Sequence, residues 1–106
     1  ENLVAFFSDP HTALSLARIE CHYFVNGAFL EPNQLLRNAD RLAGIPGVIV
    51  QGRYDIICPL RSAWELHQAW PGSELHIVAD AGHAASEPGI RSALVQAADR
   101  LAMHSV

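Results

Sequence analysis

The predicted fold is decided by the stretch Gly47-Val48-Ile49-Val50-Gln51-Gly52-Arg53-Tyr54-Asp55. Its first four residues, 47–50, form a short apolar run of mainly β-branched side chains that lies between Pro46 and Gly52. Such a run is typical of a strand covered on both faces, as in a parallel sheet. Because one strand cannot form a sheet by itself, the flanking sequence is expected to supply a second strand and covering helices.

The residues downstream continue in the order helix, strand, helix. Apolar positions at helical spacing precede the breaker Pro71-Gly72, and residues 74–78 predict a second strand. A final helix is expected to begin with Ser86 as its N-cap and Pro88 in its first turn. Its expected core face consists of Ile90, Ala93, Leu94, Ala97 and Leu101. Strands separated by a helix in this way are parallel and joined by a right-handed crossover, so the expected fold class is α/β.

The sequence upstream of residue 47 predicts helices only. Asp9-Pro10 is a helix start, since Asp accepts hydrogen bonds from free N–H groups and Pro tolerates the first helical position. Apolar residues then recur every three or four positions until Asn26-Gly27 ends the helix. A weaker helix is expected between Glu31-Pro32 and Asn38, followed by a connection that closes in Gly44-Ile45-Pro46. The two tryptophans, Trp64 and Trp70, are expected in the core.

Composition narrows the class of protein. The chain has 106 residues, 50% hydrophobic and 17% charged, which fits one globular domain at most. A formal net charge of −4 provides no basic field for nucleic acid, and no apolar stretch approaches the ~20 residues that cross a bilayer. The two cysteines predict free thiols in a reducing compartment, hence a cytoplasmic location. The chain starts without Met and within an apolar run, which predicts a segment of a longer protein.

One acidic residue and one histidine follow the two predicted strands. Asp55 comes just after the first strand and His83 just after the second, so both should lie at the carboxyl edge of the sheet. A carboxylate that accepts a hydrogen bond from Nδ1–H holds an imidazole as a general base, and the order Asp before His matches the α/β-hydrolases. The alternative is that Asp55 caps the helix starting near Pro59 and that His83 is an ordinary loop residue.

Four segments resemble the proline iminopeptidase (prolyl aminopeptidase) branch of the α/β-hydrolases. They are Ile-Pro-Gly-Val-Ile-Val-Gln-Gly-Arg-Tyr-Asp at 45–55, Ala-Trp-Glu-Leu-His-Gln-Ala-Trp-Pro at 63–71, Ala-Gly-His at 81–83 with Glu87-Pro88, and Ala-Arg-Ile-Glu-Cys-His-Tyr-Phe at 17–24. The resemblance runs from about residue 10 to 101. It implies that residues 1–38 are the C-terminal part of a helical cap domain and that residues 39–106 are the C-terminal part of the hydrolase core.

The resemblance also implies roles for individual residues. Asp55 matches the acid and His83 the base of a catalytic triad, and Glu20 matches a carboxylate that binds the α-ammonium of a peptide. Cys58 matches a position near the active site, although a small hydrophobic packing role explains it equally well. Of the residues after Glu20, His22, Tyr23 and Phe24 are candidates to line a proline pocket. No metal or other cofactor is expected, because the remaining histidines show no paired ligand spacing.

One part of the family pattern does not occur in this sequence. No Gly-x-Ser-x-Gly nucleophile elbow is found, so the expected function is the C-terminal portion of a serine aminopeptidase that releases N-terminal proline, inactive by itself. Another α/β-hydrolase, such as an epoxide hydrolase, dehalogenase or carbon–carbon bond hydrolase, and a non-catalytic interaction module stay open as alternatives. The expected partners are a peptide substrate and, through the free edge of the first strand, further copies of the chain.

Overall fold

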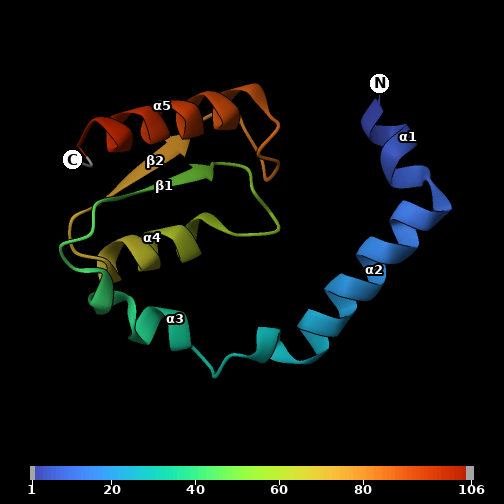
Figure 1. Ribbon diagram of the computed structural model, residues 1–106, viewed down its shortest axis with the longest axis horizontal. Helices are drawn as coiled ribbons and strands as arrows, with labels where there is room; N and C mark the ends of the chain where they lie inside the picture. Colours follow the sequence, from blue (N-terminus) through green and yellow to red (C-terminus); the bar gives the residue numbers. More distant parts are fainter. Residues whose placement is uncertain (1, 105–106) are drawn as a thin grey trace. The chain divides into compact units, whose positions relative to one another are not determined.

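The computed structural model describes residues 2–104, which fall into two compact units, Glu1–Gln34 and Leu35–Val106. The elements of each unit are shown in Figure 1. The expected domains placed the boundary at residues 38 and 39, close to this division, and their assignment to cap and core stays a prediction. No helix among residues 2–104 is long and apolar enough to cross a membrane.

The second unit is built on two parallel strands, as the α/β prediction requires. Strand β1 (Gly47–Gly52) pairs with β2 (Ser73–Val78) in a register that joins Gly47 to Ser73 and Gly52 to Val78. Helix α4 (Leu60–Ala69) connects the strands, and α5 (Pro88–His104) follows β2. Both helices contact both strands, from opposite sides of the sheet (Figure 1). The parallel pair with one helix on each face confirms the expected α/β fold.

Trp70 fixes the start of β1. A Cβ atom at Gly47 would lie 2.0 Å from the indole ring of Trp70, so only glycine lets the ring pack against the strand. The indole Nε1 of Trp70 donates to the carbonyl oxygens of Leu42 and Ile45, each 3.2 Å away. Both acceptors lie in the connection that precedes β1. The sequence prediction that Trp70 belongs to the core is consistent with this packing.

The core of the second unit is small, because two strands offer little surface. Its buried apolar residues are Ala39, Ala63, Ala81, Ile90 and Ala97. The prediction that Leu94 belongs to the core face of α5 is wrong, because this residue is 42% exposed. Two strands lie only about 4.8 Å apart, whereas a helix with its side chains is about 10 Å wide. Two strands therefore do not cover the whole apolar face of α5. Trp64 was also wrongly expected in the core, because it is 52% exposed in an open groove with Leu75 and Ile77.

The start of α5 differs from the expectation by one residue. The helix begins at Pro88, and the amide of Arg91 donates to the carbonyl of Glu87 at 2.9 Å. Glu87 therefore occupies the cap position that the sequence assigned to Ser86. The side chain of Glu87 is engaged elsewhere, with the backbone of Gly82.

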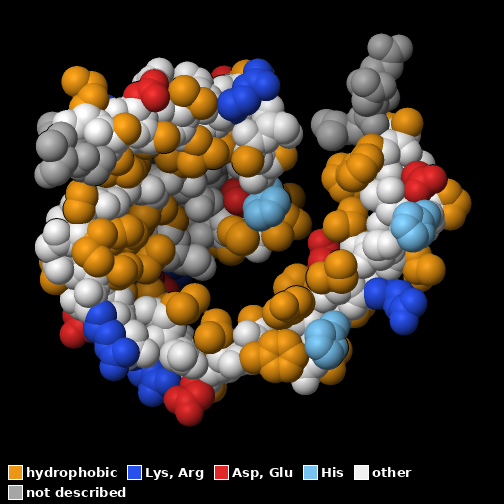
Figure 2. Space-filling view, viewed as in Figure 1, with side chains coloured by type: hydrophobic (Ala, Val, Ile, Leu, Met, Phe, Trp, Pro, Cys, Tyr) orange, Lys and Arg blue, Asp and Glu red, His pale blue; other side chains and the backbone are white. Residues whose placement is uncertain are grey.

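The first unit consists of helices. They are α1 (Asn2–Ser8), α2 (Pro10–Val25) and the short turn η1 (Gly27–Phe29). The predicted start of α2 is confirmed, because the Asp9 carboxylate accepts a hydrogen bond from the Thr12 amide at 2.9 Å and Pro10 takes the first position. None of the residues of α2 is buried, and hydrophobic side chains lie along its surface (Figure 2).

The weak helix expected between residues 31 and 38 is shorter than predicted. It is reduced to α3 (Gln34–Arg37), which is followed by the 3₁₀ turn η2 (Ala39–Leu42). Asn33 has a φ of 57°, a left-handed conformation that a right-handed helix excludes. The helix therefore starts only after this residue.

Candidate active site

The loops that follow β1 and β2 are joined by backbone hydrogen bonds. The amide of Arg53 donates to the carbonyl of Val78 at 2.9 Å, and the amide of Tyr54 donates to the carbonyl of Ala81 at 3.0 Å. At Gly52 the approach is so close that a Cβ atom would lie 2.0 Å from the carbonyl oxygen of Gly82. The two loops are thus held side by side at the carboxyl edge of the sheet.

This arrangement brings Asp55 and His83 together, as the sequence predicts. His83 Nδ1 lies 3.0 Å from Asp55 Oδ2, and the second carboxylate oxygen, Oδ1, accepts a hydrogen bond from the Cys58 amide at 2.8 Å. The Asp55 side chain is 7% exposed and that of His83 is 54% exposed. An ionised carboxylate only accepts hydrogen bonds, so Nδ1 is the donor in this contact, and a neutral ring held in this way has its lone pair at Nε2.

The alternative prediction, that Asp55 caps the helix starting near Pro59, accounts for part of its contacts. Its carboxylate does bind a backbone amide three residues on, but α4 begins at Leu60, and its cap residue is Pro59, whose side chain makes no capping hydrogen bond. Asp55 therefore stabilises the turn of 55–58 rather than the helix. The turn contact leaves the other carboxylate oxygen for His83, so the two roles coexist.

Electrostatics favour the ionised form of Asp55. Burial acts to raise the pKa of this carboxyl group, but the hydrogen bond from the Cys58 amide and the contact with His83 outweigh it and hold the pKa below its ordinary value. The carboxylate is therefore charged at neutral pH. It can both fix the orientation of the imidazole and stabilise an imidazolium cation.

Two polar side chains that the sequence reasoning did not single out hold the loops in place. The buried Gln51 donates from Nε2 to the carbonyl of Cys58 at 2.7 Å and so fixes the loop of Asp55. The carboxylate of Glu87 accepts from the amide of Gly82 at 2.9 and 3.1 Å and so fixes the loop of His83. The sequence signal for Gln51 is a polar residue at the end of an apolar strand, and Glu87 precedes the proline that opens the last helix.

Cys58 lies beside the pair. Its thiol is free and exposed, and ligand atoms of Asp55, Cys58 and His83 all lie within 4.8 Å of one another. The expectation that Cys58 stands near the candidate catalytic residues agrees with this distance. Within this chain the thiol is not packed in the core, and both the pocket role and the packing role of Cys58 stay predictions for the longer protein.

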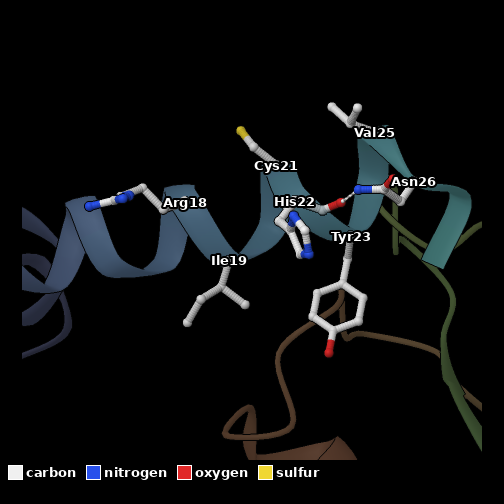
Figure 3. Close-up of a pocket in the computed structure, with 7 residues that line it drawn as sticks. All are labelled: Arg18, Ile19, Cys21, His22, Tyr23, Val25 and Asn26. Atoms are coloured by element: carbon white, nitrogen blue, oxygen red, sulfur yellow. Dashed lines mark hydrogen bonds between the residues drawn. The ribbon is translucent and has the colours of Figure 1, made fainter. Parts of the chain in front are cut away.

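The other predicted site residues lie on α2, in the first unit. Glu20, Tyr23 and Phe24 are all exposed, and Phe24 is 76% exposed. Figure 3 shows Ile19 and Tyr23 on one side of α2 and Cys21 on the other. Because these side chains surround the helix, they do not enclose a cavity within this unit.

An aromatic group at the end of α2 was not expected from the sequence. The Phe29 ring lies 5.4 Å from that of His22 and 5.7 Å from that of Tyr23, measured between ring centres. Phe29 and Ala28 have φ values of 60° and 54°, which are uncommon for residues other than glycine. This left-handed turn brings Phe29 back onto the helix, and no sequence signal before Gly27 indicates it.

Comparison with known proteins decides the family. The model of the α/β-hydrolase family described as TAP-like protein matches residues 12–101, which is most of the chain. The chain belongs to the TAP-like α/β-hydrolase family. In this TAP-like chain the parallel pairing of β1 and β2 brings Asp55 and His83 into contact.

Curated relatives of this TAP-like chain carry the name proline iminopeptidase. A Xylella fastidiosa protein (strain 9a5c) is 57% identical over 100 residues, 93% of this chain and 32% of its own length. A Xanthomonas citri protein is 57% identical over 103 residues, 96% of this chain and 33% of its own, and an Arabidopsis thaliana protein is 54% identical over 94 residues, 88% and 25%. The predicted resemblance is confirmed, and the chain spans about a third of the length of the bacterial relatives.

Proposed function

We propose that this chain is the C-terminal part of a serine aminopeptidase that releases N-terminal proline from peptides. The observation that carries the proposal is the contact between His83 Nδ1 and Asp55 Oδ2 at 3.0 Å, at the carboxyl edge of a parallel sheet. The names of its relatives, which are at least 54% identical in the three cases above, support the substrate class. A peptidase-type hydrolase is the coarser function to which both observations point.

In the proposed mechanism a serine from another part of the longer protein attacks the carbonyl carbon of the N-terminal proline. Nε2 of His83 accepts the serine proton as the Oγ–C bond forms, and Asp55 stabilises the resulting imidazolium through Nδ1–H. The proton then passes to the leaving amine as the C–N bond breaks, which leaves a prolyl ester. Water, deprotonated by the same imidazole, hydrolyses the ester and restores the serine.

Glu20 is proposed to bind the substrate's free α-ammonium group. An aminopeptidase has to recognise a cation one residue from the bond that it cleaves, and a carboxylate does so through charge-assisted hydrogen bonds. Glu20 lies one turn of α2 before Phe24 and three residues before Tyr23, whose rings are proposed to contact the pyrrolidine of proline. Since all three side chains are exposed in the first unit, they are available to a ligand.

The 106 residues by themselves are proposed to be inactive. No serine of this sequence lies in a Gly-x-Ser-x-Gly motif, and an imidazole without its nucleophile retains little of the rate of a triad. We therefore propose that the nucleophile belongs to another part of the longer protein. A serine at that position would indicate a peptidase, and an aspartate would indicate an epoxide hydrolase or a dehalogenase. The identity of that residue separates the proposal from its alternatives.

The test is hydrolysis of prolyl-p-nitroanilide by a protein extended to the length of the relatives. We expect the wild type to prefer the prolyl over the alanyl amide and His83→Gln to lose activity about 10³-fold or more. His76→Gln is the matched control, because His76 is also an exposed histidine of the second unit. A protein that cleaves neither amide, or a His83→Gln variant as active as His76→Gln, contradicts the proposal.

Glu20 is tested separately with the same protein. Glu20→Gln should lower kcat/KM for prolyl-p-nitroanilide roughly 10- to 150-fold, the value of one hydrogen bond to a charged group, while its activity on an ester without an amino group is unchanged. Glu65→Gln serves as control, since Glu65 lies in an exposed ion pair with Arg61. Equal losses on both substrates would show that Glu20 acts on folding and not on the ammonium group.

We further propose a cytoplasmic location for the longer protein. Both cysteines, Cys21 and Cys58, are free and exposed, and exposed thiols persist in reducing compartments. Fractionation of the source cells tests this, and recovery of the protein with oxidised cysteines from an extracellular fraction would contradict it.

A further inference from the structure

Three different kinds of metal ligand converge where the two loops meet. A thiol from Cys58, a ring nitrogen from His83 and a carboxylate oxygen from Asp55 lie within 4.8 Å of one another. His83 and Cys58 are exposed, so an ion in solution reaches them without any movement of the loops. Thiolate sulfur, imidazole nitrogen and carboxylate oxygen are the three kinds of side-chain ligand that bind Zn²⁺ in proteins.

The spacing is close to that of a tetrahedral zinc site. Bonds of about 2.0–2.3 Å to the metal place neighbouring ligand atoms roughly 3.3–3.8 Å apart. His83 Nδ1 and Asp55 Oδ2 are already 3.0 Å apart, and one ligand atom from each of Asp55, Cys58 and His83 lies within 4.8 Å of the other two. Three protein ligands leave the fourth position for water.

The loops also limit how far the ligands can separate. Cys58 donates its amide to Asp55 Oδ1 at 2.8 Å and accepts from Gln51 at its carbonyl at 2.7 Å, so the backbone of two ligands moves as one piece. The Glu87 carboxylate holds the amide of Gly82, next to the third ligand. An ion therefore orders few groups that the fold has not already ordered.

We infer that Asp55, Cys58 and His83 form a binding site for a soft divalent cation, Zn²⁺ or its analogues, and that the bound ion inhibits the imidazole. Binding requires the Cys58 thiol to release its proton to solvent. It also requires the Nδ1 lone pair of His83, so the ring proton moves to Nε2. The sequence led us to expect no metal, because the other histidines lack paired ligand spacing, and the ion inferred here departs from that expectation as an inhibitor rather than a catalytic cofactor.

The inhibitory consequence rests on the proposed function. An imidazole that binds a metal at Nδ1 and carries its proton at Nε2 cannot accept a proton from a serine at Nε2. The ion also takes the place of the hydrogen bond between Nδ1–H and Asp55. Zinc binding and general-base catalysis therefore exclude each other at this pair of residues.

Co²⁺ is the probe for binding, because cobalt bound to a thiolate gives a charge-transfer band and intense visible bands when it is four-coordinate. The chain of 106 residues, freed of metal with a chelator, is titrated with Co²⁺ and the cobalt is then displaced with Zn²⁺. We expect one saturable site with both features. Absence of a saturable thiolate band at a tenfold excess of Co²⁺ would overturn the inference.

Matched variants assign the ligands. Cys58→Ser should abolish the charge-transfer band, and His83→Gln should weaken Zn²⁺ binding roughly tenfold or more, since even residues that only support a ligand contribute 10- to 100-fold. Cys21→Ser and His76→Gln are the controls, because each removes an exposed residue of the same type elsewhere. If Cys21→Ser abolishes the band and Cys58→Ser does not, the ion binds elsewhere and the assignment is wrong.

The consequence for activity is read on the extended protein. Zn²⁺ should inhibit hydrolysis of prolyl-p-nitroanilide reversibly, and Cys58→Ser, which keeps Asp55 and His83, should be inhibited at least tenfold less strongly. Cobalt binding to the 106-residue chain needs no activity, so its outcome stands even if the peptidase proposal fails. Equal inhibition of wild type and Cys58→Ser would contradict the inhibitory role, and lack of cobalt binding would contradict the site.

Discussion

Replacing Gly52 with alanine should separate the two loops that carry Asp55 and His83. The new Cβ atom would lie 2.0 Å from the carbonyl oxygen of Gly82 and 2.7 Å from that of Ala81. Both obstacles are backbone atoms, so no side-chain rotation relieves the overlap. The loops have to move apart by more than 1 Å, on the order of the difference from ordinary van der Waals contact.

The cost follows from what that movement breaks. Overpacking costs typically about 1–3 kcal/mol, and loss of the hydrogen bond from the Tyr54 amide to the Ala81 carbonyl adds about 0.5–1.5 kcal/mol. We therefore expect Gly52→Ala to lower the free energy of unfolding by about 1.5–4.5 kcal/mol. Gly44→Ala is the control, because at a φ of 86° with nothing within 4 Å of its Cβ position it carries only backbone strain, about 1–2 kcal/mol.

Urea unfolding of the chain measures both variants. With a slope of about 1–3 kcal/mol per molar urea, Gly52→Ala should lower the urea midpoint by roughly 1–2 M relative to wild type. A Gly52→Ala protein whose free energy of unfolding stays within about 0.5 kcal/mol of wild type, the range of ordinary surface substitutions, would refute the close approach of the two loops. It would also remove the reason for placing His83 beside Asp55.

Three further predictions concern the same unit. Glu87→Ala should destabilise the chain by about 1.5–3 kcal/mol in urea unfolding, because the Gly82 amide loses a charged acceptor, whereas Glu87→Gln retains one oxygen and should cost less; equal losses would contradict the role of the charge. Because the pKa of Asp55 is lowered in the folded chain, ionised Asp55 stabilises the fold above its ordinary pKa, and this stability is lost as the pH falls through the lowered value. Wild type should therefore lose stability below about pH 4 more steeply than Asp55→Asn. Parallel pH profiles of the two proteins would argue against this. Because β1 pairs with only one strand among residues 2–104, we expect the chain to self-associate in light scattering, and a clean monomer at high micromolar concentration would contradict this.

The sequence predicted the sheet and the candidate pair because both depend on local patterns. An apolar β-branched run bounded by Pro46 and Gly52 indicates a strand whatever surrounds it, and the parallel order of the strands then places Asp55 and His83 at one edge. The start of α2 was predictable for the same reason, since the cap at Asp9 is a contact between residues three positions apart. Local rules therefore located the elements and the pair.

Features that depend on distant contacts could not be predicted. Gly52 and Gly47 read as ordinary strand glycines until the fold brings Gly82 and Trp70 against them. The exposure of Leu94 follows from the width of a two-stranded sheet, which helical periodicity does not encode. Glu87 looked like part of a helix start, and only the fold shows that its carboxylate binds the loop of His83 instead.

The central claim is that Asp55 holds the imidazole of His83 with its proton on Nδ1, and ¹⁵N NMR of the histidine rings at neutral pH, with a metal chelator present, tests it most directly. For the neutral form of the His83 ring we predict the proton on Nδ1 and none on Nε2 in the wild type, and loss of this preference in Asp55→Ala. An Nε2–H tautomer in the wild type, or the same tautomer mixture with and without the Asp55 carboxylate, would contradict the claim.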